Sequence, residues 1–167
     1  MGITKLSVEP FAKVAIDILG PINPASSTGK QFLLVYVDLA TRYPDAVPLS
    51  SITTEAVAQA LFEICSRVGF PEQVTSDNGS QFTSKHFEAF CNLLEMKHIR
   101  TSVYHAQSNG ACERYNGTLK RCLRKLVADI PRQWDKYVPA ALFSYRDTPH
   151  ETTGYSPFEL IYGHTQR

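Results

Sequence analysis

Three runs of apolar residues open the chain, and each has the pattern of a β-strand. Residues 11–19 are apolar and rich in β-branched side chains, and Gly20-Pro21 ends the run. Residues 31–38 are almost continuously hydrophobic, as expected for a strand that is covered on both faces, and residues 43–49 predict a third strand. Because the connections between them are short, we expect an antiparallel arrangement.

The remainder of the chain alternates between helical and extended patterns. Apolar residues recur at helical spacing across residues 54–68, and Gly69 with Pro71 ends this helix. Residues 72–76 and 98–103 predict a fourth and a fifth strand. Further helices are expected at residues 84–94, 112–128, 133–146 and 156–163. This order predicts an α/β fold in which helices flank a five-stranded sheet of mixed direction.

Length and composition are those of a single domain. The chain has 167 residues, of which 43% are hydrophobic, so it can bury a core without disulfides or metal staples. We expect a core domain at residues 11–167 behind a short N-terminal extension at residues 1–10. The four cysteines are scattered, without the pairing of a zinc site or of a secreted framework, so free thiols are expected.

Nothing in the chain predicts a membrane segment. No apolar stretch approaches the roughly 18 residues of a membrane span, and the first ten residues lack the apolar centre of a signal peptide. We therefore expect a soluble, intracellular protein without a membrane partner. The formal net charge of +1 does not exclude nucleic acid as a partner, because a global balance can hide a local basic surface.

Three acidic residues stand at the ends of predicted elements. Asp17 lies near the end of the first strand, Asp77 follows the fourth strand in a turn, and Glu113 opens the predicted helix at 112–128. If the first and fourth strands pair, the two aspartates become neighbours, and the helix could bring in the glutamate. Three carboxylates could then hold two hard divalent cations about 3.5 to 4 Å apart, as phosphoryl transfer on DNA requires.

Taken singly, these acids have ordinary structural explanations. Asp17 can be an acid at a strand edge, Asp77 a turn former, and Glu113 a first-turn acid that complements the helix dipole. A chain with 16 acidic residues also contains many pairs at any chosen spacing. The specificity must therefore come from the flanking residues.

The flanking residues resemble those of a known family. The segments Ile16–Pro21, Ser76–Phe82 and Tyr104–Asn116 are similar to the three motif blocks of the Asp-Asp-Glu integrases of retroviruses and LTR retrotransposons. The family's characteristic gap of 35 residues separates Asp77 from Glu113. A fourth block, Gly154–Gly163, is similar to a segment that follows the core in gypsy-type and spumavirus-like integrases. The similarity covers residues 11–163.

The resemblance implies a ribonuclease H-like fold and a polynucleotidyl transferase with endonuclease activity. Such an enzyme trims the 3′ ends of a retroelement DNA copy and joins them to target DNA. By this resemblance Asp17, Asp77 and Glu113 are both catalytic and metal-binding. They would hold two Mg²⁺ or Mn²⁺ ions, with Asp17 bridging both ions, Asp77 completing one site and Glu113 the other.

The resemblance also implies a DNA-binding surface beside the acids. The polar segment 104–111 is predicted to be a loop, and the helix after it carries Asn116 and Lys120 on the same face as Glu113. Ala106 stands where the family commonly has proline, and Gly117 where it often has a basic residue. The alternative is a solvated loop and helix face. The predicted DNA-binding residues are Gln107, Ser108, Asn109, Arg114, Asn116, Lys120 and Arg124.

Partners and location follow from the resemblance too. We expect the DNA ends of the element and target DNA as partners, a homodimer or higher oligomer, a host chromatin factor, and a nuclear destination. The zinc-binding and C-terminal domains of whole integrases are not recognised in this sequence. Alternatives within the fold are a ribonuclease H or a cut-and-paste transposase. The alternative from another class is a domesticated integrase core that serves as a DNA- or protein-binding scaffold without catalysis.

Overall fold

The computed structural model describes residues 9–101 and 106–167. Five strands occur in this part of the chain: β1 (Lys13–Leu19), β2 (Phe32–Asp38), β3 (Pro44–Leu49), β4 (Gln73–Ser76) and β5 (Lys97–Arg100). The helices are α1 (Thr54–Val68), α2 (Ser80–Thr83), α3 (Lys85–Leu93), α4 (Ala106–Leu126), the 3₁₀ helix η1 (Pro131–Tyr137), α5 (Val138–Asp147) and α6 (Pro157–Tyr162). None of the described helices has the length and apolar character needed to cross a bilayer.

The five strands form one mixed sheet in the order β3-β2-β1-β4-β5. The pairs β1–β2 and β2–β3 are antiparallel, whereas β1–β4 and β4–β5 are parallel. In the β1–β4 register Ala15 lies opposite Thr75. Continued by two residues, this register places Asp17 beside Asp77. The predicted mixed sheet is therefore confirmed, and the condition for bringing the two aspartates together, pairing of the first and fourth strands, is met.

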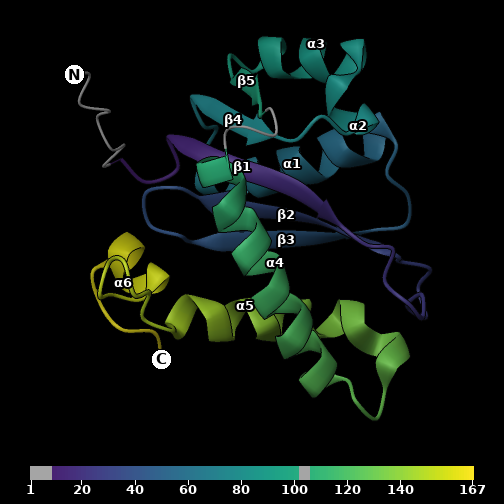
Figure 1. Ribbon diagram of the computed structural model, residues 1–167, viewed down its shortest axis with the longest axis vertical. Helices are drawn as coiled ribbons and strands as arrows, with labels where there is room; N and C mark the ends of the chain where they lie inside the picture. The colour runs from purple at the N-terminus through teal and green to yellow at the C-terminus, as the bar shows by residue number, and fades with distance from the viewer. Residues whose placement is uncertain (1–8, 102–105) are drawn as a thin grey trace.

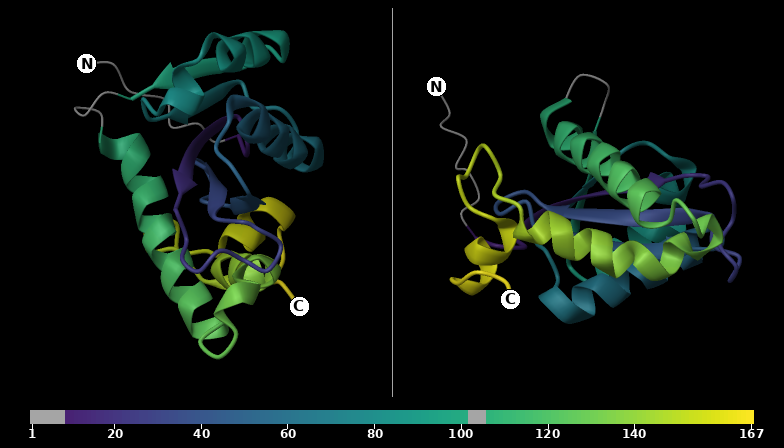
Figure 2. Two further views of the ribbon diagram at one scale, coloured as in Figure 1. Left: turned by 90° about the vertical axis from the view of Figure 1, so that its right-hand side faces the viewer. Right: turned by 90° about the horizontal axis from the view of Figure 1, so that it is seen from below.

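Helices cover both faces of the sheet, as Figures 1 and 2 show. Side chains alternate between the faces of a strand, so β1 sends Val14 and Ile16 to the face packed against α1 and α3. Ala15 and Leu19 point to the opposite face, into a second core with α4, η1 and α5. Asp17 has the same parity as Ala15, and it therefore faces α4.

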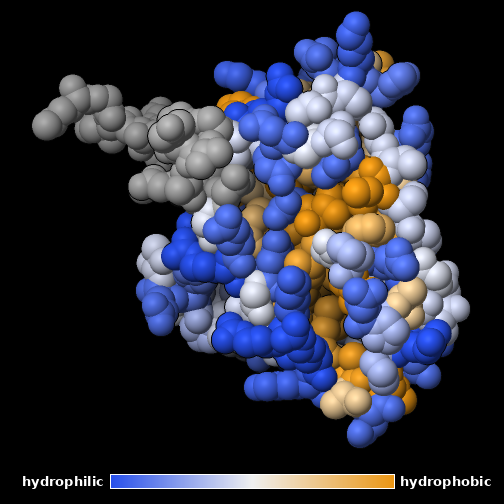
Figure 3. Space-filling model, turned by 45° about the vertical axis from the view of Figure 1, so that its right-hand side comes forward, coloured by the Kyte–Doolittle hydropathy of each residue, from blue (hydrophilic) through white to orange (hydrophobic). Residues whose placement is uncertain are grey.

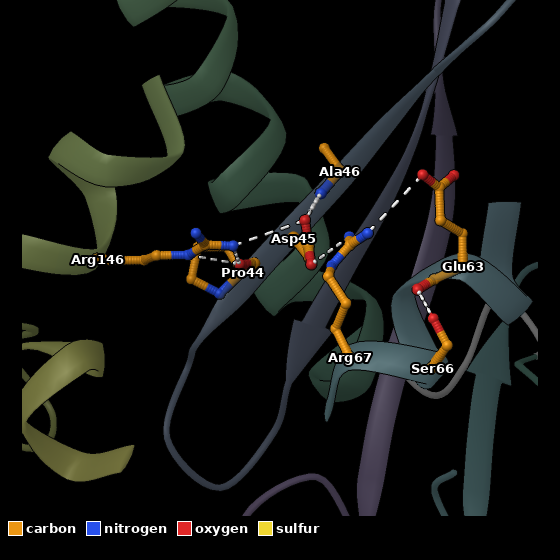
Figure 4. A network of polar contacts seen from close by, with 7 residues as sticks. All are labelled: Pro44, Asp45, Ala46, Glu63, Ser66, Arg67 and Arg146. Atoms are coloured by element: carbon orange, nitrogen blue, oxygen red, sulfur yellow. Dashed lines mark hydrogen bonds and ion pairs between the residues drawn. The ribbon is translucent and has the colours of Figure 1, made fainter. Parts of the chain in front are cut away.

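A buried carboxylate joins the edge strand to a helix from each layer (Figure 4). Asp45 on β3 lies 2.9 Å from Nη2 of Arg67 on α1 and 3.6 Å from Nη2 of Arg146 on α5. The Arg146 guanidinium also donates hydrogen bonds of 2.7 and 3.0 Å to the Pro44 carbonyl. It lies 4.5 Å from the centre of the Tyr43 ring. Asp45 thus links α1 and α5 through the edge of the sheet.

Two of the predicted helices differ in extent from the structure. Helix α4 begins at Ala106, six residues before the predicted start, so Glu113 lies inside the helix rather than at its opening. Residues 106–110 are therefore helical and not a loop. Their loop-forming composition is overridden because Cys112, Tyr115 and Leu119 further along bury one face of α4 against the sheet.

The predicted helix at 133–146 is divided between η1 and α5. Pro139 stands in the first turn of α5, where its missing N–H group prevents a continuous α-helix from η1. The short helix α2 lies between the turn predicted after Asp77 and the helix predicted from residue 84, in a segment for which no element was predicted. The end of the predicted fifth strand, residues 102 and 103, lies outside the described residues.

Candidate active site

The two aspartates are held at neighbouring strands by local hydrogen bonds. The Ile18 N–H donates to Asp17 Oδ1 over 2.8 Å, and the Asn116 amide nitrogen donates to Asp17 Oδ2 over 3.2 Å. The Gly79 N–H donates to Asp77 Oδ1 over 2.9 Å. A Cβ at Gly79 would stand 3.1 Å from that oxygen and closer still to the Gln81 side chain. The tight turn after β4 therefore favours glycine.

The charge of this pair is unfavourable without a counter-ion. The pKa of Asp17 is raised to about 6, mainly by burial and also by the charge of Asp77 and a hydrogen bond between the two carboxyl groups. The Ile18 N–H and the Asn116 amide lower the pKa and oppose this shift only in part. Two carboxylates this close disfavour simultaneous ionisation, and a hard divalent cation with a preference for oxygen ligands would relieve the repulsion.

Asn116 lies against the acids rather than in solvent. Its side chain is only 9% exposed, and its amide nitrogen contacts Asp17. Its Oδ1 atom is buried and has no hydrogen-bond partner among the described residues. The sequence predicted a DNA contact for this residue from its position on the face of Glu113. In the structure its visible interaction is the orientation of Asp17, and its free oxygen is one more hard donor beside the carboxylates.

Glu113 is on the correct helix, but it does not complete a cluster. Its side chain is exposed on α4. The neighbouring Cys112 thiol has its pKa raised to about 12, first by burial and then by the charges of Asp17, Asp77 and Glu113. Within residues 9–101 and 106–167, however, no three Asp, Glu, His or Cys side chains lie close enough to hold a metal ion. The structure brings two of the three predicted ligands together.

Sequence reasoning overlooked the residues that hold the strand end before Asp77. The Thr101 N–H donates to the Ser76 carbonyl over 2.8 Å, and the Asn78 amide donates to the Thr101 carbonyl over 3.1 Å. Ser76 itself is fully buried. A signal was available, because a serine and an asparagine flank Asp77 at the end of a hydrophobic strand. Their partners come from β5 and its end, which only the tertiary structure identifies.

The predicted basic residues of α4 lie along two different grooves. Arg114 and Arg121 line a cavity of about 630 Å³ between α4, α5 and the 148–152 turn, together with His150 and Tyr145. One end of this cavity is formed by Glu113. The single basic patch predicted from sequence is therefore divided in the structure.

Lys120 and Arg124 line the second groove, a cavity of about 270 Å³ between α4 and the 20–24 segment. Its floor is apolar and includes Leu123 and Trp134. On this side of the molecule, apolar side chains form a strip bordered by hydrophilic ones (Figure 3).

The cations of α4 are available to bind anions. The ion pairs among the described residues involve Asp45, Glu63, Arg67 and Arg146, and none involves Arg114, Lys120 or Arg124. The predicted contacts Gln107, Ser108 and Asn109 fall in the first turns of α4, and their side chains lie outside the described part. Of the predicted DNA surface, the structure therefore describes the side chains only from Arg114 onward.

Comparison with known protein families gives a match that includes Asp17 and Asp77 and ends at the start of α4. Residues 7–106 match the family model described as integrase core domain. The uncharacterized protein K02A2.6 of Caenorhabditis elegans is 36% identical over 155 residues, which is 92% of this chain. The Pro-Pol polyprotein of simian foamy virus type 3 is 32% identical over 156 residues, or 93% of the chain. The chain spans only 12% and 13% of the length of these relatives.

Solved structures agree with the fold. The simian T-cell lymphotropic virus intasome in complex with the PP2A regulatory subunit B56 gamma gives a TM-score of 0.81 over 93% of this chain and 55% of the matched chain. The HTLV-2 integrase catalytic core domain in complex with magnesium, in its trimeric form, gives 0.75 over 90% of this chain and 96% of the matched chain. Both are 24% identical, and at that identity they establish the ribonuclease H-like architecture.

Proposed function

Because this chain belongs to the integrase core domain family, we propose that it catalyses polynucleotidyl transfer on DNA. The reaction would be 3′-end processing followed by strand transfer, which inserts a retroelement DNA copy into target DNA. The observation that carries the proposal is the pair Asp17 and Asp77. These carboxylates come from adjacent parallel strands, and burial and mutual repulsion raise the pKa of Asp17 to about 6.

The oxygen-rich site fits Mg²⁺ or Mn²⁺. Asp17 and Asp77 would hold the first ion, and Glu113 would move toward them to complete the second position. Two such ions, when bound, would activate the attacking oxygen and stabilise the leaving oxygen of the phosphodiester. Asn116 would keep Asp17 in its ligating orientation, because a hydrogen bond to a carboxylate ligand fixes its direction.

In this proposal one phosphorus–oxygen bond forms as another breaks. The oxygen of water or of a DNA 3′-hydroxyl attacks the phosphorus and loses its proton, and the opposite oxygen leaves and takes up a proton to become a 3′-hydroxyl. Attack by water leaves a terminal 5′-phosphate on the released fragment, whereas attack by a 3′-hydroxyl forms a new phosphodiester. No serine, cysteine or histidine needs to form a covalent intermediate. Lys120 and Arg124 in one groove, and Arg114 in the other, would hold phosphates on the two sides of α4. Gln107, Ser108 and Asn109 would contact the DNA end.

Partners and location remain proposals for this chain. The solved relatives are described as an intasome and as trimeric and dimeric catalytic core domains, which supports a homodimer or higher oligomer on DNA. Phe143 on α5 is 48% exposed, and such a residue could contribute to an interface between copies. Nuclear location and a host chromatin factor follow only from the proposed reaction.

One observation favours the alternative function. Glu113 does not lie close enough to the two aspartates to share a metal ion with them. A domesticated scaffold that only binds DNA or protein would not need the three acids to lie together. The two functions differ in a disintegration or strand-transfer assay with Mg²⁺ or Mn²⁺. We expect activity from this chain and its loss in the Glu113→Gln and Asp77→Asn variants. Equal activity in chain and variants would refute the assigned catalytic role, and a consistently inactive chain that still binds DNA would support the scaffold.

A further inference from the structure

A serine and a histidine form a hydrogen-bonded pair behind Asp77. Ser76 is the last residue of β4, and its side chain is fully buried. Its hydroxyl oxygen lies 2.9 Å from the Asp77 carbonyl oxygen and 2.7 Å from Nε2 of His98 on β5. The His98 ring also makes a T-shaped contact with the Phe87 ring, with the ring centres 5.0 Å apart. The histidine is thus held by contacts with both Ser76 and Phe87.

The protons of this pair can be assigned. A serine hydroxyl has one hydrogen, and the Asp77 carbonyl oxygen can only accept. If Ser76 donates to that carbonyl, then His98 Nε2 must carry a hydrogen and donate it to the serine oxygen. Burial lowers the pKa of His98, and the charge of Arg100 lowers it further, so the neutral ring with hydrogen on Nε2 is the expected form. The chain of donors therefore runs from His98 through Ser76 to Asp77.

These hydrogen bonds, together with others from Thr101, restrain the backbone of Asp77. The peptide group before Asp77 is fixed because the Ser76 carbonyl accepts both the Thr101 N–H at 2.8 Å and the Thr101 hydroxyl at 3.1 Å. The peptide group after Asp77 is fixed by the Ser76 hydroxyl, and the carboxylate is fixed by the Gly79 N–H. Both peptide groups and the side chain of one aspartate are therefore restrained at the point where the strand ends.

We propose that His98 and Ser76 are positioning residues, which hold the Asp77 carboxylate beside Asp17 in the orientation that a divalent cation requires. The inference rests on the proposed function for the assumption that the site binds a divalent cation. The hydrogen bonds that hold Asp77 do not depend on that function. Partners behind a metal ligand commonly change metal affinity 10- to 100-fold when they are removed. A hydrogen bond that merely satisfied a buried hydroxyl would affect folding stability without a specific effect on Asp77.

The first test is the tautomer of His98. Long-range ¹H–¹⁵N spectra of the labelled chain near pH 7 distinguish a hydrogen on Nε2 from one on Nδ1. We expect the Nε2–H form. An Nδ1–H form would require Ser76 to donate to the ring and leave the Asp77 carbonyl without its donor, and this result would overturn the inference.

The second test compares His98→Leu, His98→Gln and the control His86→Leu, whose parent histidine is exposed on α3. Hydrogen exchange of the Gly79 amide reports directly on its bond to the Asp77 carboxylate. Relative to the exchange of core amides, we expect at least tenfold faster Gly79 exchange in His98→Leu. Near-native exchange is expected in His98→Gln, which keeps an N–H donor, and in His86→Leu. Unchanged exchange in His98→Leu would overturn the proposal.

Cation affinity, measured by calorimetric Mn²⁺ titration without DNA, gives an independent readout. We expect His98→Leu to weaken Mn²⁺ binding about tenfold and His98→Gln to restore most of it. Native affinity in His98→Leu, or an equal loss in the leucine and glutamine variants, would contradict a positioning role. If the parent chain binds Mn²⁺ but transfers no strands, the proposed function fails while the positioning of Asp77 stands. If it binds no Mn²⁺, the Gly79 exchange still decides the inference.

Discussion

At the scale of single residues, the candidate site contains two aspartates whose negative charges repel each other. Asp17 and Asp77 are chemically ordinary in the sequence, and only their neighbours in the motif blocks distinguished them from the other acidic residues. The structure adds that they form a partly buried pair in which the pKa of Asp17 is raised. The contact from Asn116 to Asp17 was not predictable, because it joins residues that are 99 positions apart in sequence.

The aspartate pair should destabilise the fold above pH 6 when no cation is present. The pKa of Asp17 is raised from 3.8 to about 6, so the folded state favours the protonated acid. The associated stability is fully present below pH 3.8 and is lost as the pH rises through 6. Asp17→Asn should therefore be more stable than the parent by about 1 to 2 kcal/mol at pH 7.5, after a discount for partial exposure.

Urea unfolding between pH 4 and pH 8, in the presence of a chelator, measures this effect. The exposed Asp129→Asn variant serves as a control and should show the parent's pH dependence. Added Mg²⁺ should stabilise the parent but not Asp17→Asn. A parent whose stability is flat from pH 5 to pH 8 would contradict the assigned electrostatics of the pair.

At the scale of elements, α4 determines where the chemistry can occur. Its apolar spacing was visible in the sequence, but its start was misplaced because the amide-rich and small residues before Cys112 resemble a loop. Packing against the sheet extends the helix to Ala106 and divides its cations between two grooves. Local sequence does not reveal this division, since it depends on how α5 and the 20–24 segment flank the helix.

Lys120 should bind phosphate without reading sequence. Lys120→Ala should weaken DNA binding to a similar extent for specific and random duplexes, and it should flatten the slope of log affinity against log salt by about one unit. Fluorescence anisotropy between 50 and 200 mM salt measures both effects. Arg132→Ala removes an exposed charge from η1 and serves as the control. An unchanged slope in Lys120→Ala would exclude a phosphate contact at this groove.

Gly117 should lower the stability of α4. Glycine inside a helix costs about 1 kcal/mol relative to alanine, and a Cβ at Gly117 would meet no atom within 4 Å. Gly117→Ala should therefore raise the free energy of unfolding by about 1 kcal/mol. The matched control is Gly163→Ala, which also has open space but a φ of +75°, and it should be destabilising. Denaturant titration that finds both variants shifted in the same direction would contradict this explanation.

At the scale of the whole molecule, one sheet holds two layers of helices together. The order of elements predicted the mixed sheet. Short connections favour antiparallel pairing of the first three strands, whereas helices before the last two strands allow them to run parallel to a neighbour, so few strand arrangements remain. The linkage of α1, β3 and α5 through Asp45 was not predictable, since its partners are 22 and about 100 residues away in sequence. Likewise, the motif blocks indicated candidate site residues, but not that Glu113 would lie apart from the two aspartates.

The Asp45 linkage should contribute more to stability than the ion pair beside it. Asp45→Ala leaves Arg67 and the partly buried Arg146 without their carboxylate, and we expect a loss of about 2 to 3 kcal/mol. Glu63→Ala removes only an exposed pair with Arg67 at 3.8 Å, and its effect should stay within about 0.5 kcal/mol. Chemical unfolding of the two variants makes the comparison. Equal losses would show that Asp45 does not join the layers.

The central claim is the proposal that Asp17, Asp77 and Glu113 together bind divalent cations, with Glu113 joining the two aspartates when the cations are present. Anomalous scattering from Mn²⁺-soaked crystals of this chain tests it most directly. We predict a peak bridging Asp17 and Asp77, with carboxylate oxygens about 2.1 Å away, and a second position that draws in the Glu113 carboxylate. Manganese that binds elsewhere while these three side chains are ordered and leave the site empty would contradict the claim.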